Sequence, residues 1–100
     1  MKDTNSTMSF ESALVAVSPS LKIGKLIDRA IGLTGYTRED ITGASRSKDL
    51  VRVRHAIMHE ASQMGFSLTD IGNAVGGRDH TTVLNAIRRT EQRLRSKDAT

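Results

Sequence analysis

Apolar residues recur three and four positions apart along most of this chain, and the pattern stops only at glycines and short polar stretches. This spacing is typical of amphipathic helices, which complete a turn every 3.6 residues. No sustained alternation of apolar and polar residues indicates a strand, and the one proline is Pro19. The sequence therefore predicts an all-α protein, folded as a small helical bundle.

Two long helices are expected in the first two thirds of the chain. The first covers about residues 20–31 and ends at Gly32 and Gly35, because glycine tolerates the backbone conformation that closes a helix. The second covers about residues 49–64 and ends at Gly65. The apolar stripes of these helices predict the core, and they comprise Ile23, Leu26, Ile27, Ala30 and Ile31, then Leu50, Val53, Ile57, Ala61 and Met64.

A short helical turn and a basic loop are expected between these two helices. Thr37 is a predicted N-cap, since Asp40 follows at the spacing of a capping box. Ile41 is the predicted core contact of this turn. The stretch GASRSK, residues 43–48, is small and polar with two positive charges, and it predicts a loop.

The last third of the sequence predicts two helices joined by a glycine turn. Ser67 begins the first of them, and Gly76 and Gly77 end it. The second begins near Asp79 and reaches about Ser96, with Val83, Ala86, Ile87, Thr90 and Leu94 on one face. A short helix, a glycine turn and a longer helix make a helix-turn-helix motif, whose second helix places its first residues against bases in the major groove.

Charge and composition agree with a DNA-binding domain in the cytoplasm. The net charge is +4, and ten of the 15 Lys and Arg residues lie from Arg46 onward, as on a phosphate-binding surface. The absence of cysteine excludes disulfides and zinc fingers. The longest early apolar run, residues 13–17, is too short for an export signal or a membrane span. Residues 1–19 are interpreted as a mobile tail, residues 20–96 as the domain and residues 97–100 as its end.

The expected first turn of the last helix carries side chains that suit base edges. Asp79 can accept from a cytosine amine, His80 can donate to a base, and Thr81 has a methyl group for thymine. Each also has an interpretation without DNA contact, since Asp79 can be only a helix cap and His80 only a surface residue. In the basic loop, Arg46 suits a narrow minor groove, which attracts arginine. Lys48, Arg52 and Arg54 suit phosphates, or else only a solvated surface.

The string GGRDHTTV, residues 76–83, resembles the signature of the C-terminal DNA-binding domain (domain IV) of the bacterial replication initiator DnaA family. The resemblance extends through SLTDIGNAVGGRDHTTVLNAIRR and SRSKDLVRVR, and covers roughly residues 20–95, so that the first 19 residues match nothing recognised. It implies a Trp-repressor-like helix-turn-helix that binds double-stranded DNA at a DnaA box, with no cofactor. It assigns base contacts to Arg46, Asp79, His80 and Thr81, and backbone contacts to Lys48, Arg52, Arg54, Thr69, Arg78 and Thr82.

The initiator's ATPase module is missing from the sequence, which has no G-x-x-x-x-G-K-[ST] motif. No nucleotide is therefore expected as a partner. A native Met1 and an unmatched tail favour a natural short protein over an excised domain.

Three other functions are consistent with the same residues. A metal or enzyme site would use His55 and His59, with Glu60 or His80, but the spacing fits no known motif, and neither a metal nor catalysis is predicted. A protein-binding adaptor that has lost DNA specificity is a second alternative, with a replication initiator or another regulatory protein as its partner. A transcriptional regulator with the same fold is the third.

Overall fold

The computed structural model describes residues 19–99, and the side chains of residues 19–96. This part of the chain holds helices and no strand, so the all-α prediction is confirmed. In chain order the helices are α3 (Pro19–Thr34), α4 (Arg38–Thr42), α5 (Lys48–Gln63), α6 (Leu68–Ala74) and α7 (His80–Ala99). The tail predicted for residues 1–19 lies, apart from Pro19, outside the described residues, as do the side chains of residues 97–100.

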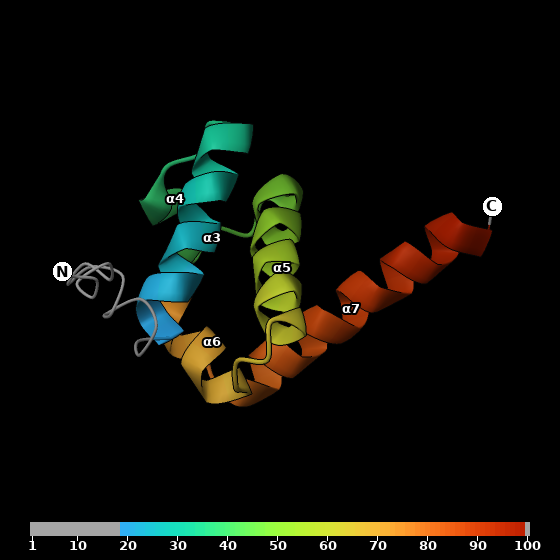
Figure 1. The fold of residues 1–100 in the computed structure, drawn as a ribbon. Coiled ribbons are helices and arrows are strands. Elements are labelled where there is room, and N and C mark those ends of the chain that lie inside the picture. Colours follow the sequence, from blue (N-terminus) through green and yellow to red (C-terminus); the bar gives the residue numbers. More distant parts are fainter. Residues whose placement is uncertain (1–18, 100) are drawn as a thin grey trace, which may run out of the picture.

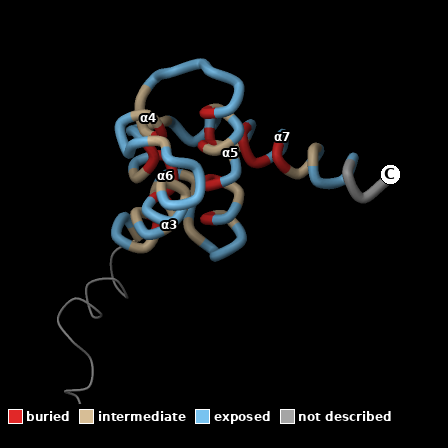
Figure 2. Tube along the Cα trace, turned by 90° about the horizontal axis from the view of Figure 1, so that it is seen from above, coloured by how far each residue is buried: buried red, intermediate tan, exposed pale blue. Residues whose placement is uncertain are grey.

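The helices form one bundle from which α7 projects (Figure 1). Helix α3 lies beside α5, and both contact α6. The first part of α7 packs against α5 and α6, whereas its last turns extend beyond the body (Figures 1 and 2). In the described part of the chain, no helix is long and apolar enough to cross a membrane.

One hydrophobic core joins all five helices. Its most deeply buried large side chains are Ile23, Ile27, Ile41, Met58, Ile71, Val75 and Val83, each at most 1% exposed. Burying one such side chain contributes about 1.5–3 kcal/mol, so these residues dominate the stability. Most predicted core positions are confirmed. The predictions for Met64 and Leu94 are wrong, since these side chains are 49% and 47% exposed. Met64 follows the end of α5, and Leu94 lines a surface pocket together with Arg52 and Ala56 of α5.

The ends of two helices differ from the prediction. Gly32 was expected to break the first helix, yet α3 continues to Thr34 and Gly35 closes it at a φ of 81°. A single glycine inside a helix costs only about 1 kcal/mol, which the packing of α3 offsets. Helix α7 reaches Ala99, three residues beyond its expected end at Ser96.

The predicted capping box of α4 is confirmed. The Thr37 side chain accepts from the Asp40 N–H at 3.0 Å, and the Asp40 carboxylate accepts from the Thr37 N–H at 3.0 Å. Arg38 also pairs with Asp28 of α3. These contacts fix a helix of one turn in place, which sets the start of the basic loop that follows it.

Candidate nucleic-acid interface

The helix-turn-helix consists of α6, a turn over residues 75–79, and α7. Ser67 caps α6, since its hydroxyl accepts from the Asp70 N–H at 3.1 Å. The turn places Gly76 and Gly77 at φ values of 80° and 73°, where residues with a side chain are strained. It closes with a hydrogen bond from the Arg78 N–H to the Gly72 carbonyl at 2.8 Å.

Two glycines let other parts of the backbone approach this turn. A Cβ at Gly72 would collide with the Arg78 carbonyl, and one at Gly76 would collide with the Thr42 carbonyl. The second contact matters for the interface, because Thr42 is the last residue of α4. Gly76 therefore lets the turn lie directly against the start of the basic loop.

The first turn of α7 presents short, exposed side chains. The Asp79 carboxylate accepts from the Thr82 N–H at 2.8 Å, so it caps the helix as expected. That hydrogen bond lowers the pKa of Asp79, which keeps a negative charge at the positive end of the helix dipole. His80, Thr81 and Thr82 are all exposed. A ligand can therefore reach the side chains of this turn.

The basic loop, residues 43–47, exposes part of its predicted set. Arg46 is exposed in the loop, and Lys48 and Arg52 are exposed at the start of α5. Arg52 also lines a pocket of about 320 Å³ with Thr90 and Arg93, which places it beside α7. Thr69 is exposed on α6. The exposed residues of the predicted set named here thus come from the loop, α5 and α6.

Arg54 departs from the exposed position that a phosphate contact requires, since it is only 5% exposed. Its guanidinium donates to the carbonyls of Ile41 at 2.6 Å, Asp40 at 3.1 Å and Ser45 at 3.2 Å. The prediction placed it on the surface because a spacing pattern treats arginine as polar. Its side chain instead enters the body to reach main-chain acceptors.

Arg78 is half-buried, and it binds main-chain carbonyls where α4 ends and the basic loop begins. It donates from Nη1 to the carbonyls of Val75 at 2.8 Å and Thr42 at 3.1 Å, and from Nη2 to the Gly43 carbonyl. Because Arg78 directly precedes Asp79, these bonds bring the basic loop next to the first turn of α7. The two predicted base-reading groups, Arg46 and residues 79–81, therefore belong to adjoining segments.

His55 is a feature that sequence patterns did not explain. It is half-buried where α5 faces α7, and its buried Nδ1 has no hydrogen-bond partner among the described residues. Burial lowers the pKa of His55, and the guanidinium groups of Arg93 and Arg89 lower it further. His55 is therefore neutral near pH 7.

The metal interpretation of the histidines receives no support from the geometry. The Nε2 atom of His59 lies 4.0 Å from Oε2 of Glu91 on α7. Among the described residues, no group of three or more His, Cys, Asp or Glu side chains could hold a metal ion.

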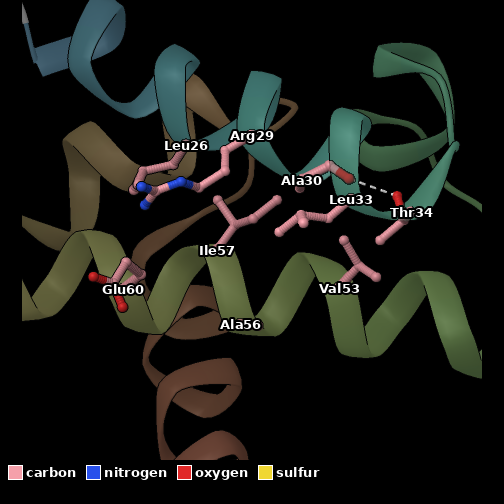
Figure 3. A pocket seen from close by; sticks show the side chains of 9 residues that line it. All are labelled: Leu26, Arg29, Ala30, Leu33, Thr34, Val53, Ala56, Ile57 and Glu60. Carbon is pink, nitrogen blue, oxygen red and sulfur yellow. Dashed lines mark hydrogen bonds between the residues drawn. The ribbon is translucent and has the colours of Figure 1, made fainter.

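A groove lies away from this surface, between α3 and α5 (Figure 3). Its volume is about 360 Å³, and Leu26, Ala30, Leu33, Val53 and Ile57 make most of its wall. Arg29 and Glu60 are its charged residues.

Fold and surface together define a helix-turn-helix protein with a basic loop beside its second helix. The family of the bacterial DnaA protein helix-turn-helix matches residues 22–90, and the chain belongs to this family. The resemblance seen in the GGRDHTTV string is thereby confirmed.

The relatives are much longer proteins. The chain is 46% identical to the chromosomal replication initiator protein DnaA of Caulobacter vibrioides (strain NA1000 / CB15N) over 66 residues, which are 65% of this chain and 13% of the relative. It is 42% identical to the DnaA of Mycoplasma capricolum over 62 residues, 61% of this chain and 14% of the relative. The chain thus spans a small fraction of their length.

A third relative extends the match. The DnaA of Caulobacter sp. (strain K31) is 38% identical over 101 residues, covering 93% of this chain and 20% of the relative. That match reaches into the first 19 residues, for which the sequence motifs had indicated no resemblance. No solved structure matches the chain significantly.

Proposed function

We propose that this protein binds double-stranded DNA sequence-specifically at sites like the DnaA box, in replication initiation or its regulation. The observation that carries the proposal is the exposed first turn of α7, which the basic loop adjoins in a chain of the DnaA helix-turn-helix family. Residues 20–96 form the DNA-binding unit in this proposal. A protein with this role works on the nucleoid in the cytoplasm, and its binding step needs no metal, cofactor or nucleotide.

Asp79, His80 and Thr81 read bases in the major groove. Asp79 caps the start of α7 and the side chains of residues 80–82 are exposed there, where the first turn of a helix also has free N–H groups. The second helix of such a motif places these first residues against base edges. His80 donates to a base acceptor, and the Thr81 methyl group contacts thymine. Asp79 combines capping with acceptance from a cytosine amine, because a carboxylate has lone pairs for both.

Arg46 reads the adjoining minor groove. Its side chain is exposed on a loop of small residues, which lets the backbone approach the DNA. A narrow A·T-rich minor groove has enhanced negative potential and attracts such a side chain.

Contacts to the DNA backbone come from Lys48, Arg52, Thr69 and Thr82, all of which are exposed. They orient the protein and carry no sequence information. The other two residues of this predicted set, Arg54 and Arg78, each donate three hydrogen bonds within the protein.

The test is fluorescence anisotropy with a duplex that carries one DnaA box and with a scrambled duplex of the same length. A preference of about a hundredfold or more for the box is expected, since specific sites typically exceed non-specific DNA by at least that factor. Weak, equal and salt-sensitive binding to both duplexes would contradict sequence-specific recognition. That result would favour the adaptor, with a replication initiator or another regulatory protein as its partner.

Replication and transcription differ in where the site lies on the chromosome. Crosslinking of the protein to chromosomal DNA at the replication origin is expected. Occupancy confined to promoters would support the transcriptional regulator instead.

A further inference from the structure

We infer that Arg54 and Arg78 are positioning residues, which hold the Arg46 loop at a fixed distance from α7 so that both grooves are read in one register. The inference rests on the proposed DNA binding and adds two residues that act through Arg46 rather than on the DNA. Six hydrogen bonds carry it, and every acceptor is a main-chain carbonyl.

Arg54 fixes the inner side of the loop. It reaches from α5 to Asp40 and Ile41 in α4, and to Ser45 beside Arg46. Five guanidinium N–H groups in a rigid plane allow one side chain to bind three carbonyls at once. The end of α4, the loop and α5 are thereby joined at one point.

Arg78 fixes the loop to the recognition helix. Its Nη1 joins Thr42 to Val75, and its Nη2 binds Gly43 at the beginning of the loop. Its main chain closes the helix-turn-helix turn on Gly72. A displacement of the loop relative to α7 would therefore break bonds to a residue that lies next to Asp79.

The surrounding backbone is shaped for this contact. Gly76 has no side chain where the Thr42 carbonyl passes, and a Cβ there would also meet the Arg78 guanidinium. The loop has few bonds of its own, since Gly43 donates to the Glu39 carbonyl at 2.8 Å and the Ser47 N–H binds the Ser45 side chain at 3.3 Å. Arg54 therefore ties the loop to α5, and Arg78 ties the start of the loop to the turn that precedes the recognition helix.

The electrostatics argue that these arginines serve more than packing. Within residues 19–96 neither guanidinium pairs with a carboxylate. Burial lowers the pKa of both side chains, and Arg78 also lowers the pKa of Arg54 through repulsion. An apolar side chain would fill the same space without that cost, so what these arginines add is the placement of carbonyls.

The decisive variants are Arg78→Lys and Arg78→Met, with Arg52→Met as the matched control on an exposed arginine. Lysine keeps the charge but lacks the planar fork that binds separate carbonyls. Binding of Arg46→Ala to altered boxes first identifies the base pairs that Arg46 reads. The affinity of each variant is then measured for the box, for scrambled DNA and for a box altered at those base pairs. Circular dichroism melting confirms that each variant is folded.

Both Arg78 variants are expected to lose about tenfold in discrimination at the base pairs read by Arg46, the size of one good base contact. The double variant Arg46→Ala/Arg78→Lys should lose no more there than Arg46→Ala alone, because Arg78 acts through Arg46. Arg52→Met should weaken binding to every duplex alike. Rescue by Arg78→Lys, or additive losses in the double variant, would overturn the inference and indicate a phosphate contact.

A second measurement is independent of DNA. The chain has no cysteine, so spin labels can be attached at Ala44→Cys in the loop and Asn85→Cys on α7, both exposed. The label-to-label distance distribution should be narrow in the otherwise unchanged protein and broader with Arg78→Lys or Arg54→Met. Unchanged distributions would contradict positioning. Broadening in a protein that shows no preference for the box would instead contradict the proposed function alone.

Discussion

The basic residues of this protein have different roles that depend on whether their side chains are exposed or buried. Arg46 and Lys48 keep their charges in solvent, where a phosphate or a groove can reach them. Arg54 has its charge inside the body, on carbonyl oxygens. Substitution of Lys48 should therefore weaken binding to all DNA, whereas substitution of Arg54, like that of Arg46, should change the discrimination between sequences.

Substitution of His80 tests base reading. His80→Ala should weaken binding to the box by about 1–3 kcal/mol and relax the preference at one base pair. Lys48→Ala is the matched control, since a lost phosphate contact weakens binding to all duplexes and lowers the salt slope by about 1. Anisotropy titrations of both variants on box and scrambled DNA separate the two effects. Equal losses on both duplexes for His80→Ala would exclude base reading.

His55 predicts a dependence of stability on pH. Its pKa in the folded state lies below the ordinary value of 6.5, so below that pH the unfolded chain binds a proton that the folded protein does not. Its contribution is therefore complete above about pH 6.5 and decreases as pH falls from there towards the folded-state pKa. His55→Gln should flatten the urea-unfolding free energy between about pH 7 and pH 5. An equally steep decrease in the variant would show that other groups cause it.

Among the elements, the turn between α6 and α7 has the strictest requirements. Gly76 and Gly77 share the left-handed conformation, but only Gly76 faces another carbonyl. Ala at either position should cost about 1–2 kcal/mol from the backbone alone. Gly76→Ala should cost more than Gly77→Ala, because it also separates the turn from Thr42. Urea unfolding of the two variants measures the difference, and equal losses would mean that the contact at Thr42 adds nothing.

The start of α7 offers a second comparison at this scale. Asp79→Ala removes the cap and should lower the unfolding free energy by about 1 kcal/mol. Asp79→Asn caps nearly as well, yet it exchanges a carboxylate for an amide. We therefore expect Asn to preserve thermal stability while changing the base preference. A loss of stability equal to that of Ala would show that the carboxylate charge is required.

Caps, turns and apolar stripes of this fold were predictable because they depend on neighbours in the sequence. Thr37 with Asp40, and Ser67 with Asp70, lie three residues apart, and the structure has both contacts. Arg54 and Arg78 were expected at the DNA because five of their six acceptors are carbonyls 9 to 36 positions away, which no local pattern reveals. A main-chain carbonyl has no signature in a sequence, so such a contact requires the fold.

The whole molecule presents an electrostatic surface of modest size. The net charge is +4, and the exposed cations assigned to DNA are Arg46, Lys48 and Arg52. Three cations bound to the DNA, two at phosphates and one in the minor groove, predict a slope of log affinity against log salt of about −3. Anisotropy titrations between low and moderate salt measure it. A slope near −5 or steeper would mean that further cations, such as Arg88 or Arg89 on α7, also reach the backbone.

Because Arg54 and Arg78 bind main-chain carbonyls, the side chains of the basic loop can be substituted without loss of these contacts. Every residue type has a carbonyl, so replacing the side chain of Thr42 or Ser45 leaves the oxygen that its arginine binds. The side chains of the loop can therefore be replaced while the hydrogen bonds that hold its main chain remain. Protein engineers could vary residues 44–47 to alter the preferred flanking bases while the core recognition by α7 is retained.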